Sequence, residues 1–322
     1  MLRYRLVIGP VLIAALVGLL WLDQWLGPVT LPTLSLNALL DPLGVDTQRR
    51  WVLPLPALAG RAELPAGLVM LVTLIGVIGL AAHELARLLA AKGVTVNGHL
   101  LWFGAAVGLL LMYLAPGYGA VQPQLAWFGT WLVVVLVASL RGQFLSQRSE
   151  GALMVAGGAL LALVYLGTLG GFFLALRQWH SAWVVAAVIL VTKACDIGAY
   201  FAGKKLGRRK LIPWLSPGKT CEGLVGGLIA SGAVGVGAVA LGRAVENPLA
   251  MELSWAYAAV TGVIFGAIGQ VGDLMVSLFK RDAGLKDSGQ FLPGFGGMLD
   301  VMDSPLLVAP VAYWLLLPMA GG

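Results

Sequence analysis

The stretch that decides how this chain is built reads Ser277-Leu-Phe-Lys280-Arg281-Asp-Ala-Gly-Leu-Lys286-Asp287-Ser-Gly-Gln-Phe-Leu-Pro293-Gly-Phe-Gly296-Gly297-Met-Leu-Asp300-Val-Met-Asp303. It holds three cations and four carboxylates, and both of its ends continue into hydrophobic segments long enough to cross a bilayer. Charge at the edge of a membrane is costly, so a cluster this dense indicates a functional site. Cations beside paired carboxylates suit a phosphate-rich substrate together with a divalent metal ion.

The composition of the whole chain places this stretch in a membrane protein. Of its 322 residues, 59% are hydrophobic and 11% are charged, whereas soluble proteins carry about 25% charged residues. We therefore expect an all-α polytopic integral membrane protein. The net charge of +6 fits membrane topology and phosphate groups, and no nucleic-acid partner is expected. Cys195 and Cys221 form neither a zinc nor a disulfide pattern and are expected to be packing residues.

Nine hydrophobic segments meet or approach the length of about 20 residues that crosses a bilayer. They span about 5–24, 66–86, 99–116, 124–141, 151–176, 181–202, 221–242, 253–279 and 299–319. The first is expected to be an uncleaved helix, because Trp21-Leu-Asp-Gln-Trp-Leu follows it instead of a small-residue cleavage site. The long connection 27–65 is expected to lie partly at the membrane interface.

The distribution of charge predicts an orientation and a division of the chain. Of the 21 Lys and Arg residues, fifteen lie on the side of the N-terminus, five on the other side, and Lys193 inside a span. The positive-inside rule then puts the N-terminus and the charged loops in the cytoplasm. Nearly all intramembrane charges fall in the last four spans, so we divide the chain into a scaffold half, 1–180, and a catalytic half, 181–322.

The sixth span carries Lys193, Asp196 and Tyr200, whose helical spacing places them on one face. Two readings stay open. Lys193 and Asp196 could form a local pair that lets both charges sit in the membrane. Alternatively, the face lines a cavity that water and a metal ion reach. The basic loop 204–210 that follows is first of all a topology anchor and a patch facing the lipid surface.

The next segment reads Ser216-Pro217-Gly218-Lys219-Thr220-Cys-Glu222-Gly223. It is not a Walker phosphate-binding loop, because Pro213 stands where that pattern requires Gly and no strand is expected before it. Instead we expect a helix start, with Ser216 as the cap and Pro217 in the first turn. A helix N-terminus beside Lys219 and Thr220 suits a phosphate group, and a plain cap with an anchoring lysine is the alternative.

The eighth span carries a polar stripe formed by Gly266, Gln270, Asp273 and Ser277. Such a stripe can be a helix-packing seam. The carboxylate of Asp273 fits that role poorly unless it is paired or bound to a metal ion.

At the start of the last span, Asp300 and Asp303 lie one turn apart after Gly296-Gly297. One carboxylate could simply complement the helix dipole. Two of them on one face are better explained as ligands of a hard metal ion such as Mg²⁺. The histidines His83, His99 and His180 have no ligand spacing and are expected in packing or at the interface.

Together these residues resemble the phosphatidate cytidylyltransferase family, also called CDP-diacylglycerol synthases. The family pattern is Ser, Lys-Arg, Lys-Asp, Pro/Gly-x-His-Gly-Gly and Asp-Arg-x-Asp. It is matched in order by Ser277, Lys280, Arg281, Lys286, Asp287, Pro293, Gly296, Gly297, Asp300 and Asp303. Upstream elements are matched by Asp196, Ala199-Tyr200, Ser216-Pro217, Lys219-Thr220, Glu222-Gly223, Gln270 and Gly272-Asp273. Two positions depart from the pattern, because Phe295 replaces the family His and Val301 the family Arg, a strong phosphate or carboxylate partner.

The resemblance implies a nucleotidyltransferase that moves the cytidylyl group of CTP onto phosphatidic acid, giving CDP-diacylglycerol and pyrophosphate. It implies one or two Mg²⁺ ions at Asp273, Asp300 and Asp303, with Asp196 as a further ligand or a partner of one. The implied catalytic group is Asp273, Lys286, Asp287, Asp300 and Asp303. The implied substrate-binding group is Ser216, Lys219, Thr220, Glu222, Ser277, Lys280, Arg281, Gly296 and Gly297. In this scheme the cations hold phosphates, and Glu222 and Asp287 either orient them or bind metal.

Three alternatives remain. The first is a related membrane transferase acting on a polyprenol or an ether lipid. The second is a transporter, since intramembrane charges also mark ion pathways, although the charges here cluster on one side and no repeated half is visible. The third is a non-catalytic relative, through Phe295 and Val301. The resemblance further implies a location in a bacterial inner membrane and a homodimer. No residue of the sequence by itself indicates the dimer.

Overall fold

The computed structural model describes residues 2–27, 66–94, 96–114, 121–146, 150–289, 291 and 296–317. Most of the connection 27–65, together with Pro293 and Phe295, lies outside these residues. Within them the chain is helical apart from one small hairpin. The elements are α1 (Leu2–Leu26), α3 (Leu68–Ala91), α4 (Gly98–Leu114), α5 (Val121–Ser146), α6 (Ala152–Leu161), the π-helix η2 (Ala162–Thr168), α7 (Leu169–Trp179), α8 (Ala182–Leu206), β1 (Lys210–Ile212), β2 (Ser216–Thr220), α9 (Cys221–Ala244), α10 (Pro248–Glu252), α11 (Trp255–Asp282) and α12 (Met298–Leu316).

The predicted all-α membrane fold is confirmed in the described part of the chain. Eight of its helical segments are long and apolar enough to span a bilayer, and α6, η2 and α7 together form one of them. The ninth predicted span is α4, a shorter apolar helix of 17 residues. The short helix α10 was not predicted. Helices dominate because a chain in hydrocarbon must satisfy its own backbone N–H and C=O groups.

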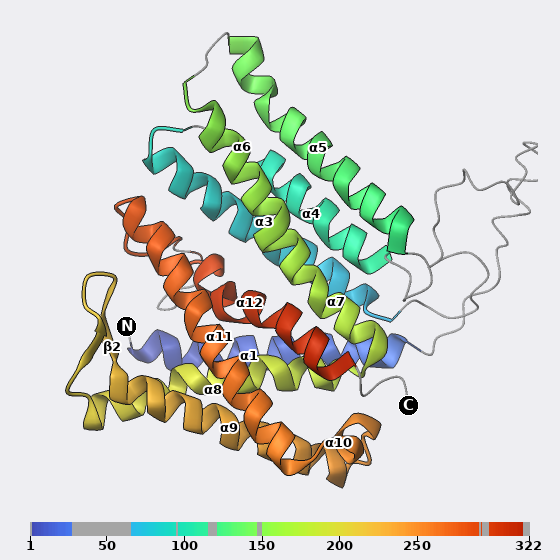
Figure 1. Ribbon diagram of the computed structural model, residues 1–322, viewed down its shortest axis with the longest axis vertical. Coiled ribbons are helices and arrows are strands. Elements are labelled where there is room, and N and C mark those ends of the chain that lie inside the picture. The colour runs from blue at the N-terminus through green and yellow to red at the C-terminus, as the bar shows by residue number, and fades with distance from the viewer. Residues whose placement is uncertain are drawn as a thin grey trace, which may run out of the picture.

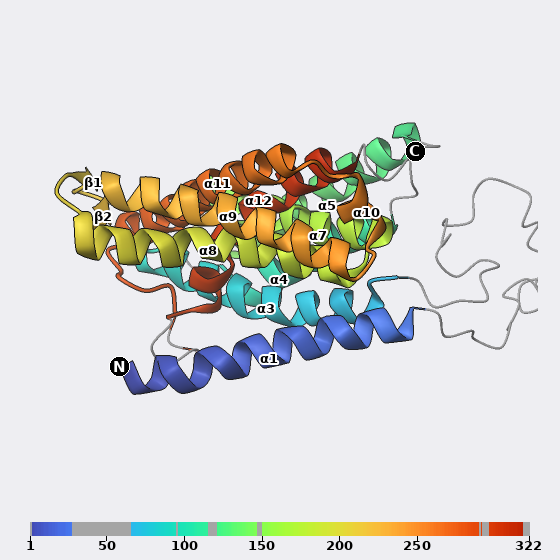
Figure 2. The same ribbon diagram turned by 90° about the horizontal axis from the view of Figure 1, so that it is seen from below.

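The helices form two packed groups with α12 between them (Figure 1). One group contains α3, α4, α5 and the continuous rod α6–η2–α7, and the other contains α8, α9 and α11. Helix α12 contacts α3 and α7 on one side and α8 and α11 on the other. Helix α1 lies outside this arrangement, against α3 and α8 (Figure 2). The division at residue 180 stays a prediction, and α12 joins the helices on both sides of it.

Small residues let α8, α9 and α11 approach one another closely. A Cβ atom added to Gly227 would lie 2.7 Å from the carbonyl oxygen of Cys195, and one added to Gly235 would lie 2.6 Å from that of Ala258. Helices surrounded by lipid gain little from burying apolar area, so close van der Waals contact stabilises their association. Cys195 is buried at this crossing as a free thiol, in agreement with its expected packing role.

A buried ion pair ties α1 to α7, far from the charged stretch in sequence. The Nε of Arg177 lies 2.6 Å from Oδ2 of Asp23, and the side chains are only 7% and 2% exposed. The other oxygen of Asp23 accepts hydrogen bonds from Val69 N and Met70 N at the start of α3. Arg177 is one of the five cations that the sequence places between spans, on the side away from the N-terminus. It lies instead inside the last turn of α7, where Asp23 neutralises it.

The segment before α9 differs from the prediction. Ser216–Thr220 forms strand β2, which pairs antiparallel with β1, so Ser216 is not a helix cap. Thr220 takes that role, because its Oγ1 accepts a hydrogen bond from Gly223 N at 3.1 Å. The expectation failed because Pro217 suits an extended strand at a sheet edge as well as a first helical turn. The hairpin lies at the same end of the bundle as the N-terminus (Figure 2).

Candidate active site

Four elements bring charged side chains together at the hairpin end of the bundle. Lys193 and Asp196 come from α8, Lys219 from β2, Asp273 from α11 and Asp303 from α12. We call these five residues the carboxylate–lysine cluster. Its members lie 110 positions apart in sequence at the extremes, so only the tertiary fold unites them.

On α8, Lys193 connects two carboxylates of the cluster. Its Nζ lies 3.4 Å from Oδ2 of Asp196 and 3.5 Å from Oδ1 of Asp303. The local Lys–Asp pair therefore exists, but it also reaches α12 and belongs to a wider set of charges. Tyr200, expected on the same face, is largely exposed, and its ring lies 5.8 Å from the Lys204 ammonium.

Lys219 and Gln270 form the second connection within the cluster. The Nζ of Lys219 lies 2.6 Å from Oδ2 of Asp273 and donates to Oε1 of Gln270 at 2.7 Å. Gln270 in turn donates from Nε2 to Oδ1 of Asp196 at 2.6 Å. The polar stripe predicted on α11 thus faces the cluster, while Gly269 and Gly272 beside it form the packing seam. A Cβ on Gly272 would collide with the carbonyl of Asp303, so glycine brings α12 close to Asp273.

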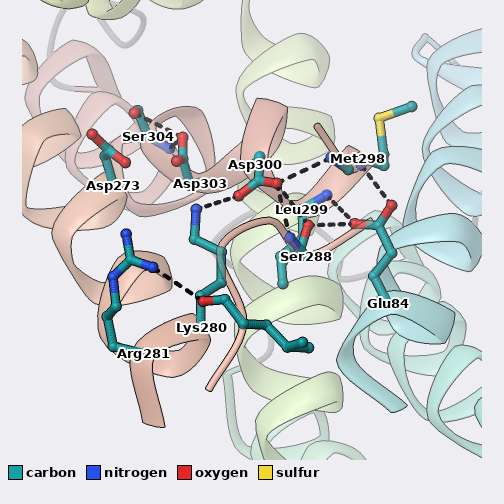
Figure 3. Close-up of polar contacts among 12 residues, drawn as sticks. Glu84, Asp273, Lys280, Arg281, Ser288, Met298, Leu299, Asp300, Asp303 and Ser304 are labelled. Atoms are coloured by element: carbon teal, nitrogen blue, oxygen red, sulfur yellow. Dashed lines mark hydrogen bonds and ion pairs between the residues drawn. The ribbon is translucent and has the colours of Figure 1, made fainter. Parts of the chain in front are cut away.

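Asp303 is the most enclosed member of the cluster. It is 4% exposed, and its Oδ1 accepts hydrogen bonds from Ser304 N and from Ser304 Oγ, the latter at 2.9 Å. Its carboxylate and that of Asp273 point toward one another (Figure 3). The hydroxyl of Tyr165, on the π-helix, donates to the Asp303 carbonyl at 3.4 Å. Neither Tyr165 nor its π-helix was anticipated from the sequence, although π-helical turns often occur at functional sites.

Asp300 faces a different environment from Asp303 (Figure 3). Its Oδ1 lies 2.6 Å from Nζ of Lys280, and its Oδ2 accepts from Ser288 N, Ser288 Oγ and Gly297 N at 3.0 to 3.1 Å. Both oxygens are engaged by the connection between α11 and α12 and by Lys280. The role of Asp300 as a metal ligand stays a prediction, and in this structure it positions Lys280 and the loop.

The predicted glycines enclose carboxylates. Gly296 has a φ of +96°, and a Cβ added there would lie 2.7 Å from Oδ2 of Asp300. A Cβ on Gly297 would collide with Ser288 Oγ and with the carboxylate of Glu84. These two positions therefore require glycine for backbone geometry and close approach, whatever they do for substrate.

The remaining predicted site residues line the same end of the bundle. Arg281 donates to the carbonyls of Leu215 and Leu285, which links α11 to the hairpin turn. Lys286 and Asp287 are exposed on the connection after α11, and Ser277 lies half-buried one turn after Asp273.

Glu222 accepts hydrogen bonds from the backbone N–H groups of Arg208 and Arg209 at 3.0 to 3.2 Å. It therefore fastens the entry to the hairpin, and its role in orienting cations or binding metal stays a prediction.

A metal ion fits this donor set in one specific way. In the part of the chain described, no three carboxylate, imidazole or thiol groups converge closely enough to hold an ion unaided. Asp273 and Asp303 nevertheless present two facing carboxylates. Mg²⁺ usually takes one or two protein carboxylates and completes its octahedron with water and substrate phosphates. The two facing carboxylates of Asp273 and Asp303 match that requirement, with Lys193 and Lys219 beside them.

Comparison with known proteins agrees with this architecture. Residues 55–318 match the cytidylyltransferase family, and the chain belongs to that family. It is therefore a nucleotidyltransferase of the membrane. It is similar to a phosphatidate cytidylyltransferase of Bacillus subtilis (strain 168), with 32% identity over 73% of this chain and 84% of the relative.

Two further relatives are also similar to this chain. The phosphatidate cytidylyltransferase of Staphylococcus aureus (strain COL) is 34% identical over 79% of this chain and 92% of its own. The uncharacterized protein YnbB of Escherichia coli (strain K12) is 40% identical over 42% of this chain and 43% of its own.

Proposed function

We propose that this protein transfers the cytidylyl group of CTP to phosphatidic acid, giving CDP-diacylglycerol and pyrophosphate. The observation that carries the proposal is the convergence of lysines and carboxylates from α8, β2, α11 and α12 at one end of the helices. Membership of the cytidylyltransferase family and the names of the two bacterial relatives support the choice of nucleotide and lipid.

The chemistry is a displacement at phosphorus. An oxygen of the lipid phosphate attacks the α-phosphorus of CTP, the bond from that phosphorus to the bridging oxygen breaks, and pyrophosphate leaves with the bonding pair. The attacking phosphate is already anionic at neutral pH, so no strong general base is required. The main barrier is the approach of two polyanions, which fixed cations lower by neutralising charge and aligning the groups.

In this proposal, different residues of the site contribute to phosphate binding, metal binding and charge balance. Lys219 and Lys280 are ammonium groups held by Asp273 and Asp300, ready to meet phosphate oxygens. Arg281 and the exposed Lys286 add positive charge at the mouth of the site. Asp273 and Asp303 would hold Mg²⁺, with Asp196 beside them. When bound, that ion would neutralise phosphate charge and stabilise the leaving pyrophosphate. Lys193 balances the negative charge of Asp196 and Asp303 before substrate arrives.

Four further features belong to the proposal. We place the hairpin end in the cytoplasm, on the basis of the excess of Lys and Arg on that side, and the protein in a bacterial inner membrane. Acyl chains would enter sideways from the lipid, because the helices on either side of the site are apolar on their outer faces. A homodimer remains an expectation taken from the family resemblance.

One assay tests the reaction and separates it from the alternatives. Purified protein in mixed micelles receives CTP with phosphatidic acid, with a polyprenol, or with no lipid, each with Mg²⁺ or with a chelator. We expect pyrophosphate and CDP-diacylglycerol in equal amounts, only where phosphatidic acid and Mg²⁺ are both present. A polyprenol kinase would release CDP instead of pyrophosphate. Folded protein that releases no pyrophosphate with phosphatidic acid would overturn the proposal.

A further inference from the structure

Glu84 is a buried carboxylate on α3 that reaches the start of α12. It is 5% exposed. Its Oε1 accepts a hydrogen bond from Met298 N at 2.8 Å, and its Oε2 accepts from Leu299 N at 2.9 Å and from Ser288 Oγ at 2.8 Å (Figure 3). Three donors thus surround one side chain that lies more than 200 positions away in sequence.

The described residues at both ends of the connection between α11 and α12 lie close around this carboxylate. A Cβ added to Gly289 would collide with Oε1 of Glu84, and one added to Gly297 would collide with its Oε2. Glycine at both positions lets the backbone pass within contact distance of the side chain. Two glycines that fit one carboxylate argue that the contact is specific and not an accident of packing.

Ser288 connects Glu84 to the predicted site. Its hydroxyl lies 2.8 Å from Oε2 of Glu84 and 3.0 Å from Oδ2 of Asp300, and its backbone N–H donates to the same Asp300 oxygen. Ser288 is fully buried. Asp300 holds Lys280 through its other oxygen at 2.6 Å. The Ser288 hydroxyl has one proton and donates to one of these carboxylates at a time, while the Ser288 N–H donates to Asp300. Ser288 therefore connects Glu84 to Asp300, and Asp300 in turn holds the Lys280 ammonium.

Glu84 also caps the helix that carries Asp303. The amide groups of Met298 and Leu299 are among the first N–H groups of α12 and have no acceptor within the helix. A carboxylate at this end also complements the helix dipole. Asp303 lies one turn further along α12. Fixing the start of this helix therefore fixes the position of Asp303 along the helix axis relative to Asp273.

We propose that Glu84 is a positioning residue for cytidylyl transfer. It fixes the start of α12 and the Ser288 loop, and through them Lys280 and Asp303, without itself touching the reacting phosphates. The inference rests on the proposed function, and it makes α3 of the expected scaffold half part of the catalytic apparatus. A charged group buried in a membrane helix is costly, which favours a functional role for Glu84.

The test compares Glu84→Gln with Asp23→Asn. Both changes neutralise a buried carboxylate that accepts two N–H groups at a helix start. We expect Glu84→Gln to lower kcat for CDP-diacylglycerol formation about 10- to 100-fold, as displacement of a supporting group commonly does. Asp23→Asn should lower the thermal unfolding midpoint but leave kcat per folded molecule unchanged. Glu84→Gln behaving like Asp23→Asn would reduce Glu84 to a structural role and overturn the proposal.

A double-mutant cycle then tests the path. If Glu84 acts through Ser288, the variant Glu84→Gln with Ser288→Ala should be no slower than the slower single variant. If the loss of kcat in the double variant equals the product of the two single losses, the path is contradicted. If Glu84→Gln does not fold, Ser288→Ala alone carries the test, because it removes the same connection from the loop side.

Hydrogen exchange at the amides of Met298 and Leu299 distinguishes failure of this inference from failure of the proposed function. Faster exchange in Glu84→Gln supports the cap independently of activity. A wild-type protein that makes no CDP-diacylglycerol refutes the proposed function instead.

Discussion

Two sets of buried charges lie at opposite ends of the helices and differ in how completely they are closed. Asp23 and Arg177 are 2% and 7% exposed, and each oxygen of Asp23 is engaged. In the carboxylate–lysine cluster, Lys193 and Asp196 are 31% and 34% exposed, and three carboxylates share two lysines. The first set is neutral and sealed, whereas the second retains excess negative charge and partial access to solvent. The proposed site therefore differs from the structural pair in its incomplete charge pairing and partial exposure, not in the presence of buried charge alone.

The largest expected effect is on the cluster. Asp303→Asn keeps the shape of the side chain but removes one of the two facing carboxylates. We expect CDP-diacylglycerol formation to fall by at least about a thousandfold, the upper range for losing one preorganised charged group, with the protein still folded. The measurement is product formation across a Mg²⁺ titration. Retained activity with an unchanged Mg²⁺ dependence would remove Asp303 from the site.

The sealed pair should respond in the opposite way. Arg177→Met leaves the Asp23 carboxylate buried without its cation, which typically costs about 3–5 kcal/mol of stability. We expect a lower free energy of unfolding in detergent and an unchanged kcat for the folded fraction. A large loss of kcat at unchanged stability would show that this end of the bundle also serves catalysis.

A change at Lys219 tests the difference between the two sets of charges most directly, because this lysine forms an ion pair but is partly exposed. Lys219→Gln should lower kcat/KM for CTP by about a hundredfold, through loss of a phosphate-binding cation. Stability should change little, since the Asp273 partner is 28% exposed and water can solvate it. Lys219→Arg is the matched control and should recover part of the activity. Equal activity of the Gln variant and wild type would exclude a role in phosphate binding.

The smallest effect is expected at an exposed pair in the same charged stretch. Asp282 lies 3.0 Å from Lys92 and is 66% exposed. Asp282→Asn should change the free energy of unfolding by less than about 1 kcal/mol and leave transfer unchanged. It is therefore the control for Asp303→Asn, with the same substitution in the same stretch. A loss of activity here would mean that general negative charge, not particular carboxylates, supports the reaction.

The sequence was sufficient for the helices and for much of the site. A long apolar run in a bilayer must satisfy its backbone groups internally, which favours a helix. Each of the nine predicted segments accordingly overlaps a helix in the described residues, and eight of these are long enough to span a bilayer. Asp196, Asp273 and Asp303 were selected as carboxylates in or at the edge of apolar spans, and Lys219 as a cation beside an expected helix start. The fold does bring these four residues together.

What was missed depended on partners far apart in the chain. Glu84 was visible as a lone acid in an apolar span, but nothing local connected it to Met298. Helical spacing alone also suggested that Asp300 and Asp303 would act together. In the structure, Ser288 and Gly297 engage Oδ2 of Asp300 and Lys280 on α11 engages Oδ1, so the surroundings of Asp300 differ from those of Asp303. Strand β2 escaped prediction for a similar reason, since its pairing with β1 is tertiary information.

The place of α12 between the two helix groups has a consequence for biosynthesis. Lys193, Lys219 and Lys280 all precede α12 in the chain, so each leaves the ribosome before Asp300 and Asp303 do. The carboxylates of α12 are therefore synthesised after the cations with which they pair. They also follow Glu84, which binds the start of that helix. A nascent chain that lacks α12 would contain every lysine of the site but not Asp300 or Asp303. The enzyme would therefore first become active when α12 packs between the two helix groups.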